Sequence, residues 1–262
     1  MGNHKRAGFT IIETMLFLGV SGLLIVLLIG GTGASINTQR YQDAAQSLKS
    51  LLQQQYADVN SVVNSRDDNW SCGDSATPSV SSTIKDNRGQ SSCILIGKYV
   101  RLENEKISIY NVVAAKKASN SEDTDIKLLK SNYTLNISKD NVEQSVMEWG
   151  TRIAFPRPQT ADSRKIGILI VRSPDSGQIY TFTNSDSSVP SDGNVGPASL
   201  ASMLVSGTSV PGQGSRVICV DSGGMFASND RAVVLLEYAS TSGAVELQSN
   251  TILKENGRNQ QC

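Results

Sequence analysis

An uninterrupted apolar run near the N-terminus limits what this chain can fold into more than any other feature. Residues 14–31 contain no charge, and the eight residues before Phe9 include Lys5 and Arg6 but no acid. As an α-helix, residues 9–31 would extend about 34 Å, which is enough to cross a bilayer. Because basic flanks stay in the cytoplasm, we expect one pass through the cytoplasmic membrane, with the N-terminus inside and the C-terminal part outside.

A single acid, Glu13, interrupts the beginning of this run. On insertion scales a charged side chain inside a membrane helix costs about 2.5–3.5 kcal/mol, so such a residue usually has a function and a partner. A cleaved secretory signal peptide and a plain N-terminal anchor both leave Glu13 unexplained. A third alternative stays open, in which the shallow position of Glu13 lets its carboxylate reach the lipid headgroups.

The residues around Gly8 resemble the class III prepilin signal. Basic residues precede Gly8, residues 9–13 read FTIIE, and the apolar run follows. The N-terminus is therefore similar to those of type IV pilins and of type II secretion pseudopilins. The resemblance implies that a prepilin peptidase removes residues 1–8 by cutting between Gly8 and Phe9, and that it N-methylates Phe9. It also implies that Glu13 pairs with the N-terminal amine of a neighbouring subunit during assembly.

The same resemblance implies a structural role without catalysis. The length of the chain and its irregular exported part favour a minor subunit of a type IV pilus-like filament. A type II secretion pseudopilin and a DNA-binding minor pilin for DNA uptake are the alternatives. The implied partners are other pilin subunits, the prepilin peptidase, an inner-membrane assembly platform and membrane lipid before assembly, after which the subunit joins an extracellular filament.

Enzyme chemistry finds little support in the residues. His4 is the one histidine, and it lies in the expected leader, so the body of the protein has no catalytic triad with histidine and no histidine-built metal site. No phosphate-binding glycine loop or nucleophile elbow occurs, and we expect no cofactor and no metal. An anchored extracellular hydrolase remains the enzyme alternative.

A second helical segment follows the apolar run. Residues 32–64 have polar residues on one face and apolar residues at helical spacing on the other, which predicts an amphipathic helix that packs on a sheet. Interior glycines weaken a helix by about 1 kcal/mol each, so we expect loosening at Gly30, Gly31 and Gly33. The apolar positions are Tyr41, Ala44, Ala45, Leu48, Leu51, Leu52, Val59, Val62 and Val63.

Residues 65–262 read as an exported β-rich domain. Short β-like runs alternate with tight turns, which favours an antiparallel sheet. We expect hairpin turns at 173–177 and 239–243 and a short helix at 198–205. The fold class is α+β, with the long N-terminal helix packed on the sheet as in pilins, and the last third weakly resembles minor pseudopilins of the GspH/FimT kind. The expected strands are 93–102, 106–114, 133–137, 152–155, 166–172, 178–183, 216–220, 232–238 and 244–247.

Four cysteines suggest two disulfides in an exported domain, because none of them forms a CxxC pair typical of zinc or thioredoxin-like sites. Three pairings are compatible with the sequence. We favour Cys72 with Cys93 and Cys219 with Cys262, because each pair then stays within one region of the chain. Four free thiols are the alternative.

The distribution of charge suggests two further hypotheses, a calcium site and a contact with DNA. With 24 basic and 24 acidic residues, the chain has no bulk attraction for nucleic acid. The acidic stretches, residues 122–125 and Asp186 with Asp192, lack EF-hand spacing and read as solvated loop charge rather than a calcium site. A local basic cluster is a candidate DNA contact, although charge at strand edges also prevents aggregation. Its residues are Arg152, Arg157, Arg164, Lys165 and Arg258, with Arg172 and Lys254 nearby.

Overall fold

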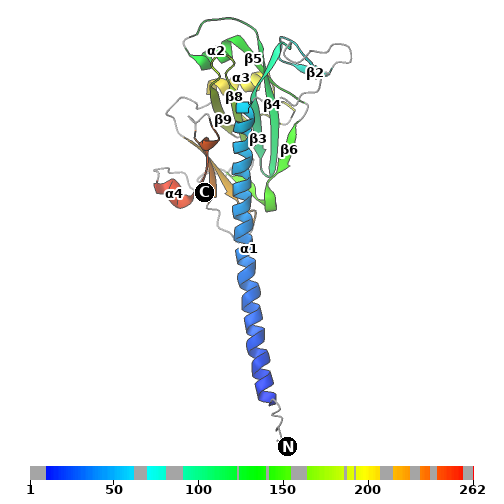
Figure 1. Cartoon of the computed structure of the whole chain (residues 1–262), viewed down its shortest axis with the longest axis vertical. Helices are drawn as coiled ribbons and strands as arrows, with labels where there is room; N and C mark the ends of the chain where they lie inside the picture. Colours follow the sequence, from blue (N-terminus) through cyan, green and yellow to red (C-terminus); the bar gives the residue numbers. More distant parts are fainter. Residues whose placement is uncertain are drawn as a thin grey trace, which may run out of the picture.

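The computed structural model has a long helix that projects from a β-rich domain (Figure 1). It describes residues 10–61, 70–80, 91–122, 124–139, 142–154, 164–185, 188–191, 193–206, 215–224, 231–236, 241–255 and 262. The α+β class that we predicted is confirmed, with the helix at the N-terminus and antiparallel sheets after it.

Helix α1 (Ile11–Ser61) contains 51 residues and is continuous. It passes through Gly30, Gly31 and Gly33, where we expected it to loosen. An unpaired backbone group costs several kcal/mol in hydrocarbon, more than the about 1 kcal/mol of one interior glycine, so a continuous helix is what a membrane span would need here. The membrane and amphipathic segments that the sequence indicates are therefore two halves of one rod. Residues 62–64 of the expected helix lie outside the described residues.

The C-terminal half of α1 packs into the domain by the face that the periodicity predicted. Six of the nine apolar positions are buried, and Leu51 is half-buried. Gln55 and Tyr56 are also buried, although we did not predict them. The Tyr41 hydroxyl donates to the carbonyl of Val220 at 2.8 Å, and the Tyr56 hydroxyl bonds Thr181 Oγ1 at 2.8 Å. Burial raises the pKa of Tyr56 to about 12.

A six-stranded antiparallel sheet forms the centre of the domain. Its order is β5-β4-β3-β8-β9, and β6 pairs with β4 beyond the end of β5. The register of β3 shifts between Leu95 and Gly97, where its backbone passes close to β8. The strands are β3 (Cys93–Glu103), β4 (Lys106–Lys116), β5 (Tyr133–Ile137), β6 (Glu143–Val146), β8 (Lys165–Arg172) and β9 (Ile179–Ser185).

A second, four-stranded antiparallel sheet has the order β12-β11-β10-β7. It consists of β7 (Arg152–Ala154), β10 (Ser215–Asp221), β11 (Arg231–Leu236) and β12 (Val245–Ser249). A small ribbon pairs β1 (Trp70–Cys72) with β2 (Pro78–Val80). The remaining elements are the helices α2 (Asp125–Asn132), α3 (Pro197–Ser206) and α4 (Asn250–Glu255), and the 3-10 turns η1 (Glu148–Gly150) and η3 (Ser242–Ala244).

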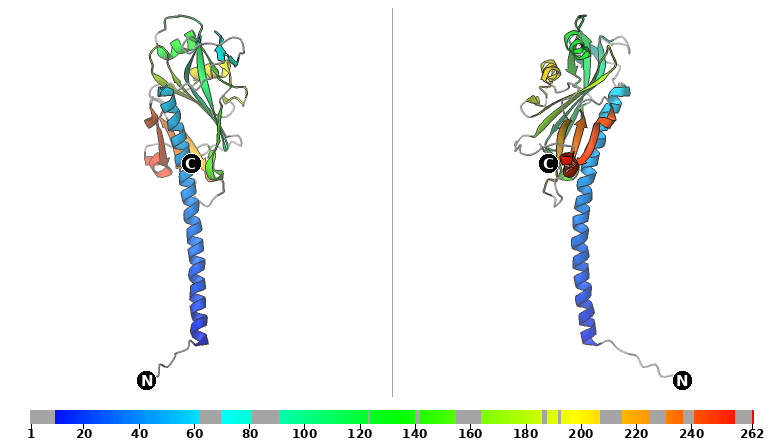
Figure 2. Two further views of the ribbon diagram at one scale, coloured as in Figure 1. Left: turned by 45° about the vertical axis from the view of Figure 1, so that its right-hand side comes forward. Right: turned by 90° about the vertical axis from the view of Figure 1, so that its left-hand side faces the viewer.

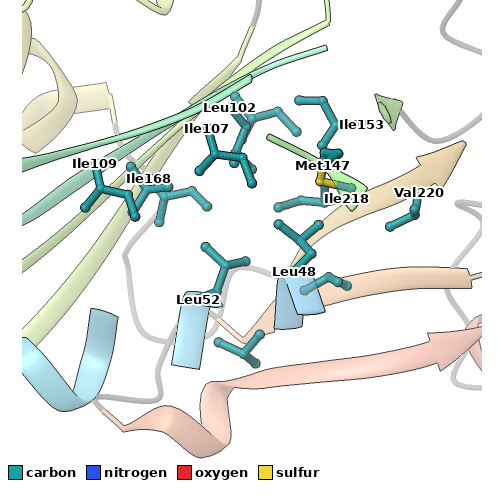
Figure 3. Close-up of a cluster of buried hydrophobic side chains, with 14 of the residues drawn as sticks. Leu48, Leu52, Leu102, Ile107, Ile109, Met147, Ile153, Ile168, Ile218 and Val220 are labelled. Atoms are coloured by element: carbon teal, nitrogen blue, oxygen red, sulfur yellow. The ribbon is translucent and has the colours of Figure 1, made fainter. Parts of the chain in front are cut away.

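Helix α1 packs against both larger sheets, and α2 and α3 cover the opposite face of the six-stranded sheet (Figure 2). In the core on the α1 side, Leu48 and Leu52 meet Leu102 and Ile168 from one sheet and Ile218 from the other (Figure 3). A third small cluster joins α4 to β10 around Leu253. The helix is therefore an integral part of the domain core.

All nine strands that we predicted are present, and their ends within the described residues differ by at most about two residues, as assignments commonly do. Residues 155, 237 and 238 of the expected strands lie outside the described residues. The turn at 173–177 is confirmed: Gly177 has a φ of +74° and its N–H donates to the Ser173 carbonyl at 2.9 Å. Of the turn expected at 239–243, residues 239 and 240 lie outside the described residues, and the next residues form η3. We did not predict β1, β2, β6, α2 or α4.

Candidate membrane and assembly site

The N-terminal half of α1 presents large apolar side chains to its surroundings. From Ile11 to Ile29 these side chains are 51% to 77% exposed. The most apolar window of 18 residues has a mean hydropathy of 2.4, and no part of it is buried against the domain. Full burial of such a side chain is worth about 1.5–3 kcal/mol, so this surface requires an apolar environment. Helix α1 is long and apolar enough to be a candidate membrane span.

The first turn of α1 is capped by Thr10. The backbone N–H of Glu13 donates to Thr10 Oγ1 at 3.3 Å, and the N–H of Thr14 donates to the Thr10 carbonyl at 3.2 Å. Thr10 and Glu13 thus stand in the spacing of a capping box, Thr-x-x-Glu, in which the acid follows the cap by three residues. We did not predict this role for Thr10, although the four-residue pattern carries the signal.

Glu13 is the one acid in the exposed apolar half of α1. Its position in the first turn is favourable, because the helix macrodipole stabilises negative charge there by about 0.3–1 kcal/mol. Its neighbours Ile12 and Phe17 are at least 70% exposed, so the carboxylate is surrounded by surface that prefers hydrocarbon. Within the described residues Glu13 has no ion pair, and the next basic residue, Arg40, lies about 40 Å along the helix. The expected cleavage site, Gly8 and Phe9, lies outside the described residues.

Both disulfides that we favoured are confirmed. Cys72–Cys93 joins the β1–β2 ribbon to the start of β3, and Cys219–Cys262 joins β10 to the last residue of the chain. No cysteine is free. Such bonds are typical of proteins that fold in an oxidising compartment.

The described members of the basic cluster are paired with acids. Arg152 Nε and Arg164 Nη1 lie 3.3 Å and 3.0 Å from Asp221 Oδ2, and Lys165 Nζ lies 3.0 Å from Glu103 Oε1. Arg157 and Arg258 lie outside the described residues. These contacts join β7, β8 and β10 to their surroundings and neutralise much of the charge that a phosphate backbone would use.

Asp221 is the centre of this ion-pair network. Burial alone would raise its pKa, but the hydrogen bond from the Gly223 N–H and the charges of Arg164 and Arg152 outweigh it. The pKa of Asp221 is therefore lower than its ordinary value. The carboxylate stays ionised well into the acid range and keeps the edge of the four-stranded sheet attached to the arginines.

Asp125 differs from the solvated loop charge that we expected. It is the first residue of α2, and it accepts hydrogen bonds from the hydroxyls of Ser173 at 2.7 Å, Ser176 at 2.5 Å and Tyr180 at 2.9 Å. It thereby attaches α2 to the β8–β9 hairpin. Asp123, Asp186 and Asp192 lie outside the described residues. Among the described residues no group of three His, Cys, Asp or Glu could hold a metal ion.

Comparison of the chain with models of known protein families, with curated proteins and with solved structures gives no match. The geometry defines the class by itself: an α+β protein with two disulfides, whose N-terminal helix is a candidate membrane span and continues into the core of the domain.

Proposed function

We propose that this chain is a minor structural subunit of a type IV pilus-like filament, which waits in the cytoplasmic membrane and assembles through α1. The observation that carries the proposal is the N-terminal half of α1, whose apolar side chains are exposed and whose first turn contains one carboxylate. The helix continues from this half into the domain without a break. The apolar side chains of such a helix can contact lipid before assembly and the helices of other subunits afterwards. No further apolar surface has to become exposed for this change. Head-to-tail packing of such helices gives an open, non-closing assembly.

Glu13 supplies both the driving force and the register of this assembly. Cleavage before Phe9 creates a cationic amine, and in the helix bundle the amine of one subunit lies at the level of Glu13 of its neighbour. An ion pair at 4 Å is worth about 4 kcal/mol at an effective dielectric of 20, which exceeds the insertion cost of about 2.5–3.5 kcal/mol for a lone charge. An incoming subunit whose Glu13 reaches the Phe9 amine of its neighbour is therefore stabilised in one axial position.

The capping geometry allows an experiment that separates charge from helix structure. Glu13→Gln keeps a residue that serves in a capping box but removes the charge, whereas Thr10→Ala removes the cap and keeps the carboxylate. Each variant is expressed in the native host, and the subunit is quantified in the membrane fraction and in sheared filaments. We expect Glu13→Gln to remain in the membrane and to disappear from filaments, and Thr10→Ala to assemble nearly as the wild type does.

Normal incorporation of Glu13→Gln together with loss of Thr10→Ala would mean that Glu13 serves only to start the helix. Processing is tested separately by mass spectrometry of the mature N-terminus. A chain that begins at N-methylated Phe9 supports the proposal. A chain that begins near Ser35, as cleavage of a secretory signal peptide after Ala34 would give, contradicts it. The pseudopilin alternative shares this helix, and incorporation into a pilus or a secretion pseudopilus distinguishes the two. The paired state of the described arginines gives no reason to prefer DNA uptake.

A further inference from the structure

The exposed indole of Trp149 lies beside α1 just before the helix becomes buried in the domain. Trp149 belongs to η1 and is 53% exposed. The guanidinium of Arg40 lies 4.8 Å from the centre of its ring. Arg40 is the first charged residue after Glu13 and immediately precedes Tyr41, a buried residue of α1. The pair therefore marks the level at which the apolar half of α1 ends and the domain begins.

The backbone of Trp149 is held in an unfavourable conformation. Its φ of 58° and ψ of 25° are left-handed, which is uncommon for a bulky residue and has an energetic cost. Neighbouring contacts fix the turn: Ser47 on α1 donates to Glu148 Oε1 at 2.9 Å, and the Thr151 hydroxyl donates to the Glu148 carbonyl at 2.8 Å. Strain of this kind persists where the surroundings enforce it, and it is concentrated at functional positions. Here its result is an indole that projects from the domain instead of packing inside it.

The helix places this pair at the outer surface of the membrane. A hydrocarbon layer of about 30 Å takes about 20 helical residues, so a span that begins near Ile11, at the start of α1, ends near Gly31. Arg40 then lies about 14 Å beyond the hydrocarbon, and the headgroup layer extends about 5–8 Å on each side. The long arginine side chain bridges the remaining distance. Ile36, one turn closer to the membrane, is also exposed and continues the apolar surface.

We propose that Trp149 and Arg40 form a contact with the headgroups of phosphate-bearing lipids in the outer leaflet. Tryptophan prefers the membrane–water interface because its ring is apolar and its N–H is polar. A guanidinium binds phosphate through paired hydrogen bonds and is less strongly hydrated than an ammonium. The contact holds the base of the domain against the membrane before assembly. The inference uses the membrane span of the proposed function but does not depend on filament formation.

The two tryptophans of the chain make the contact measurable. Trp70→Phe leaves Trp149 as the only indole, and Trp149→Phe leaves Trp70, which lies in the β1–β2 ribbon at the far end of the domain (Figure 1). Each full-length variant is reconstituted into phosphatidylglycerol–phosphatidylethanolamine vesicles, with or without a nitroxide on the headgroup. Flotation of the vesicles verifies insertion, and far-UV circular dichroism verifies the fold.

We expect the headgroup nitroxide to quench Trp149 by about twofold or more, as for indoles in the interfacial belt, and to leave Trp70 unchanged. Arg40→Gln should reduce the quenching of Trp149 in vesicles that contain phosphatidylglycerol. An inserted chain whose Trp149 is open to aqueous iodide and insensitive to the nitroxide would overturn the inference and leave the membrane span intact. Protection that grows with the protein-to-lipid ratio would also overturn it, because a second copy would then cover the indole.

Discussion

Removal of the C-terminal disulfide should destabilise the domain more than removal of the other one. Cys219 and Cys262 are 43 residues apart, and Cys72 and Cys93 are 21 residues apart. In the chain-entropy model a cross-link stabilises by reducing the entropy of the unfolded chain, and the effect grows with the logarithm of the loop length. The two loops correspond to about 4 kcal/mol and about 3.3 kcal/mol at 25 °C.

The local surroundings strengthen this order. Cys219 lies in β10 and is buried against Leu253 of α4 together with Cys262. Loss of the bond frees the end of the chain and exposes this cluster. Cys93, by contrast, lies at the first position of β3, where the ribbon that it anchors packs less of the core.

Urea denaturation of the full-length chain in detergent micelles measures both effects. We compare the wild type with the double variants Cys219→Ser/Cys262→Ser and Cys72→Ser/Cys93→Ser, so that each variant carries two serines and no free thiol from the broken pair. With a slope of about 2–3 kcal/mol per molar urea, the loss of about 4 kcal/mol in the first variant should lower the midpoint by about 1.3–2 M. A change smaller than that of the second variant would refute the loop-length argument.

Three further predictions concern the core, the central sheet and acid stability. Leu52→Ala should lower the free energy of unfolding by about 2–5 kcal/mol in the same urea assay, because Leu52 is fully buried between α1 and both sheets, whereas the exposed control Gln54→Ala should have little effect. Gly97→Ala should lower the free energy of unfolding by about 1–3 kcal/mol, because the added Cβ would lie 2.1 Å from a backbone oxygen of β8. The control Gly73→Ala should have little effect, because there is open space around Gly73. The pKa of Asp221 is lower in the folded chain than in the unfolded chain, so the stabilisation from its ion pairs is complete above the unfolded pKa of about 3.9 and is lost as the pH falls through the folded pKa. Thermal melts at a series of pH values should therefore show a smaller loss of stability in acid for Asp221→Asn than for the wild type. Equal losses in the two proteins would contradict the assignment.

The parts of the fold that the sequence predicted are those with a strong period. The buried face of α1 repeats every 3.6 residues, and strands such as β8, β10 and β11 are rich in valine and isoleucine. Strand β6 was missed because all four of its residues are exposed, so its pairing with β4 leaves no alternation in the sequence. Helix α2 was missed because only two of its eight residues are buried, and one of these, Asn132, is polar.

In the candidate site, too, some features have a signal in the sequence and others do not. Glu13 could be singled out because a charge in an apolar run is conspicuous. The sequence allowed three disulfide pairings, and the favoured one was chosen because each pair stays within one region of the chain. The contact between Arg40 and Trp149 could not be predicted, since it joins distant segments through a left-handed turn that a tryptophan does not favour. Gln55 was not among the predicted apolar positions, but its amide donates to the carbonyl of Leu51 and its side chain is buried.

The continuity of α1 also determines how the protein responds to force. A pull on the apolar end reaches the domain without a flexible segment to absorb it, because no break interrupts Ile11–Ser61. Inside the domain, the hydroxyls of Tyr41 and Tyr56 attach the helix to β10 and β9, and its leucines are held between both sheets. The force is therefore distributed over many contacts that must break at the same time, and these contacts cannot be broken one after another. A pull on the apolar end of α1 would therefore move the folded domain together with the helix.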